Sequence, residues 1–214
     1  MLKSEKLGAA LSNQPNQVSR RIRRTFEAVH DAILTSAHGL LVEHGPQAVT
    51  FEAIAKAVDM THGNVRYHFG SSSLFQAALI KHAAADLSMR LSASTDRFKA
   101  GYLSRPDLVK EIFAAFRESG CGRLVGWWSA SGEKLMLSPI LFALEEHICE
   151  LEAMNPTAVL TVSPGLGPRA LEIISLALTS SLLGNQLEQA IQAPEGSLQT
   201  LANEALSRGW GDAY

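Results

Sequence analysis

The stretch "VTFEAIAKAVDMTHGNVRYHF", residues 49–69, decides the fold of this 214-residue chain. Thr50 is a good helix N-cap for the first part of it, and Thr61 can cap a second helix. Val65 and Phe69 lie four positions apart and supply the inward side of that second helix. The pattern therefore predicts two short helices joined by a tight turn. The apolar stripe of the first short helix consists of Phe51, Ile54, Ala55 and Val58.

A longer helix precedes this pair. From residue 22 onwards apolar side chains recur at helical spacing, until Gly45 and Pro46 end the run. Two short helices packed on a longer first helix form the helix-turn-helix arrangement. With Met60, Val65 and Phe69 turned inward, the polar side chains that stay outside are His62, Asn64, Arg66, Tyr67 and part of His68. Amide and guanidinium groups suit base edges in a major groove, and hydroxyls and cations suit phosphates.

We therefore predict that the second short helix faces DNA. Gly63 would let the start of that helix approach the duplex closely, and backbone N–H groups there favour a phosphate oxygen. The basic run "RRIRR", residues 20–24, is expected to grip the backbone or an adjacent minor groove. The predicted DNA-facing residues are Thr50, Thr61, His62, Gly63, Asn64, Arg66, Tyr67 and His68, together with Arg20, Arg21, Arg23 and Arg24.

Composition and charge fit this interpretation. The chain is 46% hydrophobic, which is ample for a buried core, and its net charge is only −2. Residues 1–68 carry eight Lys and Arg against six Asp and Glu, so a slightly basic end adjoins an acidic body. A solvated helix start is the alternative explanation of the basic run. No apolar window suits a membrane span and no secretory signal opens the chain, so we expect a cytoplasmic protein without a membrane partner. Cys121 and Cys149 are expected to be core thiols.

From Thr25 to about Lys81 the sequence resembles the DNA-binding domain of TetR/AcrR-type transcriptional regulators. The segment "AVTFEAIAKAVDMTHGNVRYHFGSSSLF", residues 48–75, follows the family pattern in register, through the terminal His68 and Phe69. Three positions depart from it. Asp59 stands where the family usually has glycine in the turn, Arg66 replaces the usual tyrosine, and Ser72 replaces the usual lysine at the start of the fourth helix.

The resemblance also implies how the C-terminal half works. In TetR-like proteins the last two long helices of each subunit pair into a four-helix dimer interface. Here residues 168–192 and 197–210 are predicted to form those helices. The apolar side chains of the first cover more of its circumference than one buried stripe needs. Burial inside one subunit is the alternative. The predicted dimer residues are Leu171, Ile174, Leu178, Ser181, Leu182, Leu201 and Ala205.

A ligand pocket is expected among the helices of the C-terminal half, where aromatic and soft apolar side chains concentrate. Ordinary core packing is the alternative for each of them. The pattern names no ligand class. The predicted pocket residues are Phe113, Phe116, Trp127, Trp128, Met136 and Phe142.

Catalytic and metal sites are not expected. His62 and His68 are six positions apart, which is the wrong spacing for ligands on one helix face, and "EEHICE", residues 145–150, reads as a solvated acidic face. No GxSxG, P-loop or dinucleotide fingerprint occurs, so we expect neither an enzyme nor a cofactor.

The sequence thus predicts an all-α chain in three parts. Residues 1–21 form a flexible basic arm, residues 22–83 a three-helix helix-turn-helix DNA-binding domain, and residues 84–214 a helical effector-binding and dimerisation domain. The expected function is a homodimeric transcriptional repressor, released from a palindromic operator on double-stranded DNA by a small-molecule effector. The alternative is a helical effector-binding or protein-interaction module whose DNA-binding domain has degenerated.

Overall fold

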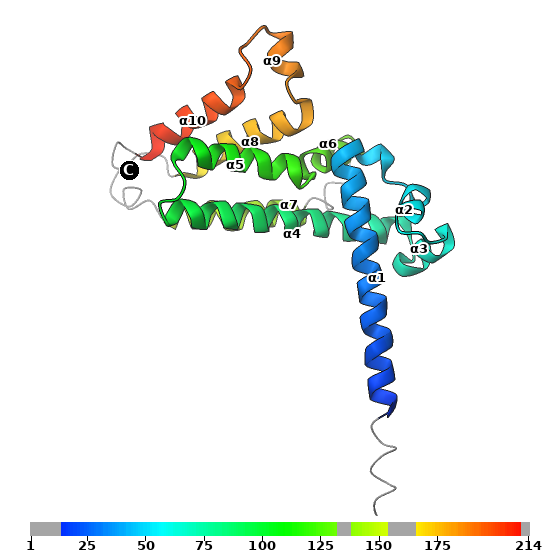
Figure 1. Ribbon diagram of the computed structural model, residues 1–214. Coiled ribbons are helices and arrows are strands. Elements are labelled where there is room, and N and C mark those ends of the chain that lie inside the picture. Colours follow the sequence, from blue (N-terminus) through cyan, green and yellow to red (C-terminus); the bar gives the residue numbers. More distant parts are fainter. Residues whose placement is uncertain (1–13, 132–137, 154–165, 211–214) are drawn as a thin grey trace, which may run out of the picture.

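The computed structural model describes residues 14–131, 138–153 and 166–210, and every regular element in these ranges is helical (Figure 1). The all-α fold with an N-terminal helix-turn-helix and a C-terminal helical domain is thereby confirmed. The helices are α1 (Gln14–His44), α2 (Phe51–Ala57), α3 (His62–Phe69), α4 (Ser72–Lys99), α5 (Arg105–Glu118), α6 (Cys121–Ser131), α7 (Ser138–Ala153), α8 (Leu166–Leu183), α9 (Gln186–Ala190) and α10 (Ser197–Trp210), with a short 3₁₀ turn η1 (Pro46–Ala48) after α1.

Hydroxyl side chains begin four of these helices. Thr50, Thr61 and Ser71 precede α2, α3 and α4, and each accepts a hydrogen bond from the backbone N–H three residues later, at 3.1 to 3.3 Å. Ser104 does the same for α5. Each bond satisfies a donor that the first turn of a helix leaves unpaired, which is why the chain starts its helices at these residues.

Helix α1 is longer than the sequence pattern predicted. It begins at Gln14, so residues 14–21 of the expected flexible arm are helical, and residues 1–13 lie outside the described part of the chain. A helix of 31 residues measures about 46 Å. Figure 1 shows its N-terminal part projecting beyond the other helices. The pattern missed this start because Val18 is the only aliphatic side chain from Gln14 to Arg21, so the sequence shows no apolar stripe there.

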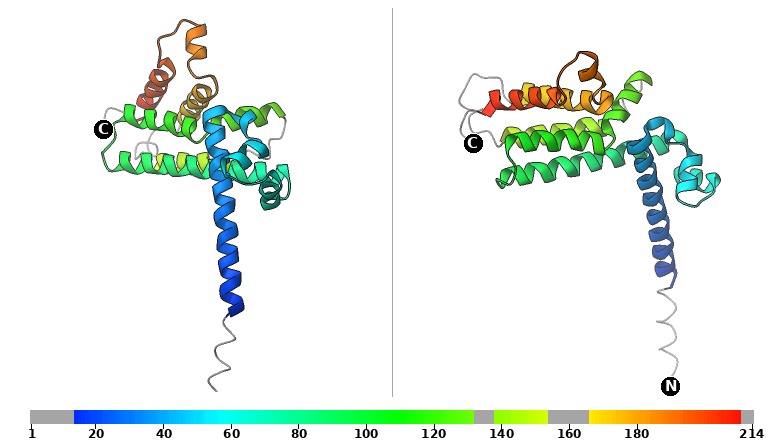
Figure 2. Two further views of the ribbon diagram at one scale, coloured as in Figure 1. Left: turned by 45° about the vertical axis from the view of Figure 1, so that its right-hand side comes forward. Right: turned by 45° about the horizontal axis from the view of Figure 1, so that its top comes forward.

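Two clusters of buried apolar side chains organise the fold. The first joins α1, α2, α3 and the start of α4, and Leu79 is its last member along the chain. The second begins at Ile80 and continues through α5, α6, α7, α8 and α10. Helix α4 therefore runs through both clusters, and Leu41 near the end of α1 also belongs to the second. Both views in Figure 2 show α1 crossing the end of the layered C-terminal helices.

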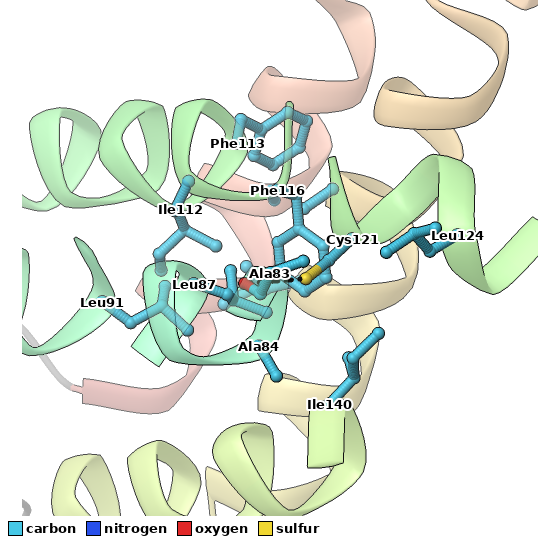
Figure 3. Close-up of a cluster of buried hydrophobic side chains, with 14 of the residues drawn as sticks. Ala83, Ala84, Leu87, Leu91, Ile112, Phe113, Phe116, Cys121, Leu124 and Ile140 are labelled. Carbon is cyan, nitrogen blue, oxygen red and sulfur yellow. Dashed lines mark hydrogen bonds between the residues drawn. The ribbon is translucent and has the colours of Figure 1, made fainter. Parts of the chain in front are cut away.

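The C-terminal cluster is built around α4 and α5. Helix α4 packs on α5 and α7, α5 packs on α8, and α8 packs on α10. Figure 3 shows Phe116 and Cys121 together among the aliphatic side chains of α4, α5 and α7. The Cys121 thiol donates a hydrogen bond to the carbonyl oxygen of Ala83 at 3.3 Å, and burial raises its pKa to about 12. The prediction of two core thiols holds for Cys121 and is wrong for Cys149, which is exposed.

The predicted helix over residues 168–192 is broken. Helix α8 ends at Leu183, and Gly184 has φ of +55°, a conformation in which a right-handed helix cannot continue. The short α9 follows, and its buried Glu188 accepts hydrogen bonds from the backbone N–H groups of Gly196 and Leu198 at 3.0 and 2.9 Å. That carboxylate ties α9 to the first turn of α10, where the dipole of the helix favours a negative charge.

Candidate nucleic-acid interface

Helix α3 has one buried edge and one polar edge. Val65 is completely buried and Phe69 is 6% exposed, both inside the helix-turn-helix cluster. The polar residues predicted to face DNA, Thr61, His62, Asn64 and Arg66, are all exposed. The helix therefore lies with the orientation that the sequence predicted, because its two apolar side chains can be buried only in that orientation.

The start of α3 is open to the outside. The Thr61 hydroxyl caps the helix, so its oxygen is engaged with the N–H of Asn64 while its own hydrogen remains available. A methyl group added to Gly63 would meet no atom of the subunit within 4 Å. The Tyr67 side chain is 79% exposed. Thr50 is exposed at the start of α2.

His68 is placed differently from its polar neighbours. Its ring is half-buried and stacks on Phe26 of α1, with ring centroids 4.5 Å apart. Burial lowers the pKa of His68, and repulsion from nearby His30 lowers it further. Both effects disfavour the charged form of the ring. The position suits packing of α3 on α1 better than a cationic contact with phosphate.

The turn between α2 and α3 explains one departure from the family pattern. Asp59 has φ of +53°, in the left-handed region where glycine pays no steric cost. Aspartate is among the few other residues that visit this region. The turn thus adopts, with aspartate, a backbone conformation that glycine favours. Ser72, at the position of the usual lysine, is exposed in the first turn of α4.

The basic run lies on the projecting part of α1. Residues 20–24 are helical, although the side chains of Arg20, Arg21, Arg23 and Arg24 lie outside those that the structure describes. At about 100° per residue, positions 20, 21, 23 and 24 fall within about 160° of the helix circumference, so they share one side of α1. The prediction that they contact the DNA backbone or a minor groove remains a prediction.

Two contacts that the sequence analysis missed connect the DNA-binding part to the C-terminal helices. Arg123 of α6 donates hydrogen bonds to the carbonyl oxygens of Leu41 and Val42, at 3.2 and 2.9 Å, near the end of α1. The Nε2 atom of His38 lies 2.8 Å from the carbonyl oxygen of Ser119, just after α5. In both contacts the side chain meets backbone carbonyl groups that are distant in sequence, so no sequence motif could have revealed either contact.

The predicted ligand pocket does not form as one site. Phe113 and Phe116 are 3% and 1% exposed in the C-terminal core, whereas Phe142 on α7 is 69% exposed. Met136 lies outside the described residues. Trp127 and Trp128 line a separate cavity between α6 and the helix-turn-helix. The prediction grouped aromatic residues by nearness in sequence, and the helices carry them to different places.

The predicted dimer residues also differ in their exposure. Leu171, Leu182 and Leu201 are exposed, and Ile174 and Leu178 are half-buried. Ala205 is completely buried in its own subunit, which corrects its assignment to an interface. Ser181 packs closely against Gly122 of α6. A methyl group added to Gly122 would overlap the hydroxyl oxygen of Ser181. The small residues of α8 thus admit α6 of the same subunit.

Neither a metal cluster nor a membrane helix occurs in the described parts of the chain. No three His, Cys, Asp or Glu side chains gather there as a metal site would require. The Nε2 atom of the buried His147 lies 3.1 Å from the carbonyl oxygen of Ser88, so His147 contacts α4. Among the same residues, no helix has the length and apolar character to cross a bilayer.

Comparison with known proteins agrees with this geometry. Residues 33–78 match the family model described as bacterial regulatory proteins, tetR family. A crystal structure of a protein from Rhodococcus sp., described as a TetR-family transcriptional regulator, has the same fold with a TM-score of 0.55 at 14% identity, covering 85% of this chain and 98% of that one. No curated relative matches the sequence. Residues 33–78 are therefore similar to the DNA-binding domain of the tetR family, and the chain shares the fold of the Rhodococcus protein.

Proposed function

We propose that the chain is a homodimeric transcriptional repressor that binds a palindromic operator and releases it when a small molecule binds. The polar edge of α3, exposed over the buried Val65 and Phe69, carries this proposal. Such an edge on a capped helix matches the donors and acceptors of a major groove. Because the proposed partner is DNA, we also propose that the protein acts in the cytoplasm.

Each exposed side chain of α3 has a proposed role. Asn64 and Arg66 read base edges, since an amide pairs with adenine and a guanidinium with guanine. His62 lies beside them at the start of the helix. Thr50, Thr61 and Tyr67 donate hydroxyl hydrogens to phosphates, and Gly63 permits the close approach. Arg20 to Arg24 add charge contacts beyond the groove. His68 supports α3 from behind.

The homodimer rests on exposed leucines of the two C-terminal helices. Leu171 and Leu182 of α8 and Leu201 of α10 are between 42% and 64% exposed, although α8 and α10 pack side by side. Apolar side chains gathered on neighbouring helices favour a partner surface. A two-fold axis there would present two copies of α3, which reach successive major grooves when they lie about 34 Å apart.

Selection of bound fragments from random duplex DNA, followed by affinity measurement on the selected sequence, tests the proposal. We expect a near-palindromic site whose affinity falls steeply with salt, because phosphate contacts release counterions. Arg66→Ala and Asn64→Ala should each weaken specific binding by about tenfold or more. Arg117→Ala, which removes a similarly exposed arginine from α5, is the matched control and should leave affinity unchanged.

The alternative is a helical effector-binding or protein-interaction module with a degenerate DNA-binding domain, a reading motivated by Ser72 at the usual lysine position. It predicts weak binding to duplex at low salt with no selected sequence. Unchanged operator affinity in both α3 variants would count against the proposed recognition helix. Turnover of a substrate or a cofactor in the mass spectrum of the purified protein would instead indicate an enzyme.

A further inference from the structure

A cavity of about 270 Å³ lies between the helix-turn-helix and α6. Its walls come from the end of α1 with η1, the start of α2, the first turns of α4, and one side of α6. Trp127 and Trp128 form the wall on α6, with ring centroids 4.9 Å apart. Phe51 of α2 and Phe75 of α4 form the wall on the DNA-binding side. The cavity therefore lies at the junction between the DNA-binding part and the C-terminal helices.

The lining defines the chemistry of a ligand. None of the described residues that line the cavity carries a charge, so an ion would lose its hydration without compensation. Four aromatic rings favour a flat aromatic molecule. The hydroxyl of Ser72 and the amide of Gln76 offer hydrogen bonds to one or two polar groups. A cavity of about 150 Å³ already holds benzene, so this one has room for one or two fused rings.

The crevice in the C-terminal core is a weaker candidate. It lies among α4, α5, α7, α8 and α10, and its volume is about 50 Å³. A water molecule occupies about 30 Å³ in the liquid, so the crevice in this conformation has space for little more than solvent. Phe116, one of the residues predicted to line a pocket, helps to fill it.

Two rings that line the cavity also contact the recognition helix α3. Phe51 meets His62 of α3 edge to face, with ring centroids 5.8 Å apart. Phe75 meets Phe69 at the other end of α3, with centroids 5.1 Å apart. A molecule held between the tryptophans and these phenylalanines would therefore press on side chains that set the position of α3.

We propose that this junction cavity is a binding site for a small, neutral, aromatic effector with one or two hydrogen-bonding groups, and that its occupancy changes operator affinity by shifting α3 relative to α6. The site itself stands on the cavity alone, whereas its regulatory effect rests on the proposed DNA-binding function. Differential affinity for two arrangements of α3 is what such regulation requires.

Isothermal titration of the full chain with 4-bromophenol tests the site, because this probe is neutral at pH 7, aromatic, and carries one hydroxyl. Trp127→Ala removes one exposed wall and should weaken binding about fivefold or more. Gln76→Phe fills the cavity and should abolish binding. Ala170→Leu fills the core crevice instead and should leave binding unchanged. Circular dichroism verifies that each variant is folded.

The anomalous signal of the bromine in crystals grown with the probe gives a readout independent of the variants. We expect the bromine between Trp127 and Phe51. A bromine in the core crevice, loss of binding in Ala170→Leu only, or no binding by the wild type up to the solubility of the probe would overturn the site. If Gln76→Phe fails to fold, the bromine position and Trp127→Ala still decide.

Operator affinity measured with and without the probe separates this inference from the proposed function. Specific DNA binding without any probe binding would leave the proposed function standing and remove the site. Probe binding without specific DNA binding would leave the site standing and remove the proposed function. With the cavity occupied, we expect the operator affinity to change at least fivefold, and an unchanged affinity would overturn the regulatory role.

Discussion

Gly63 shows how one residue can be judged separately for folding and for binding. Nothing in the subunit lies within 4 Å of a methyl group added there. Gly63→Ala should leave the fold intact and raise stability by about 0.5 kcal/mol, since alanine is the better helix former. The same methyl group would point outward at the start of α3, where we propose close contact with DNA. We expect operator affinity to fall about tenfold through overpacking.

Thermal unfolding and operator titration of the same Gly63→Ala preparation check this prediction. Gly39→Ala is the matched control, since Gly39 also lies in open space but on α1. Both variants should be at least as stable as the wild type, and only Gly63→Ala should bind operator less well. Equal operator affinity in the two variants would place the start of α3 away from the duplex.

Two histidines make the stability depend on pH. Burial lowers the pKa of both His68 and His82 in the folded chain. Repulsion from His30 lowers the pKa of His68 further, and repulsion from His38 does the same for His82. Unfolding returns both rings to water and to a pKa near 6.5. The unfolded chain then binds more protons than the folded chain once the pH falls below about 6.5. The free energy of unfolding should therefore fall between that pH and the lowered pKa values.

Urea unfolding at pH 7.5 and pH 5.5 measures the effect. The variant carrying both His68→Gln and His82→Gln should lose less stability between the two pH values than the wild type does. Carboxylates of Asp86 and Asp31 oppose the shift at His82, so His68→Gln alone should account for part of the change. An identical loss in the wild type and in the double variant would contradict this assignment.

At this scale the sequence predicted what depends on local order and missed what depends on distant neighbours. Asn64 and Arg66 flank Val65, and the helical spacing of Val65 and Phe69 turns both polar side chains outward, so periodicity alone could predict their exposure. The half-burial of His68 depends on Phe26, which lies on another helix. No pattern within α3 carries that information.

Among the helices, starts were easier to predict than ends. A capping hydroxyl such as Thr61 acts within four residues, so the sequence displays it directly. The end of α8 depends instead on the left-handed backbone at Gly184, and glycine inside an apolar run is compatible with either outcome. The projecting start of α1 had no apolar stripe to mark it.

Glycines of α6 determine how closely it packs on α8. A methyl group on Gly122 would overlap the hydroxyl of Ser181, and one on Gly126 would overlap Leu182. Gly122→Ala should therefore destabilise the protein by about 1–3 kcal/mol through overpacking. Gly39→Ala makes the same substitution in a helix where space is open, and should stabilise by up to about 1 kcal/mol.

Thermal and denaturant unfolding of the two glycine variants compares packing with helix propensity directly. The variants change the same atoms, so opposite signs can come only from their surroundings. Equal effects on stability would mean that α6 does not rest on α8 as described. Because Arg123 of the same helix holds the end of α1, Gly122→Ala also tests whether α6 must sit close to α8 to keep that contact.

For the whole molecule, the sequence could predict an all-α fold with an N-terminal helix-turn-helix but not where a cavity forms, and the dimer stays a prediction. Helix α4 passes from one buried cluster to the next between Leu79 and Ile80 with no break in its pattern. The junction cavity brings together Phe51 and Trp127 from distant parts of the chain. Only the three-dimensional arrangement could reveal it.

The exposed leucines give a test of the proposed assembly. Leu171 and Leu201 are 64% and 48% exposed on neighbouring helices, and burying each against a partner is worth about 1–2 kcal/mol. The double variant Leu171→Glu, Leu201→Glu places two like charges in each half of that surface and should yield folded monomers. Operator affinity should then fall by at least a hundredfold, since one α3 alone binds half a site. Met89→Glu changes a side chain that is 63% exposed on α4 and should leave the dimer intact. Light scattering after gel filtration decides the case: a double variant that remains dimeric would move the interface away from α8 and α10.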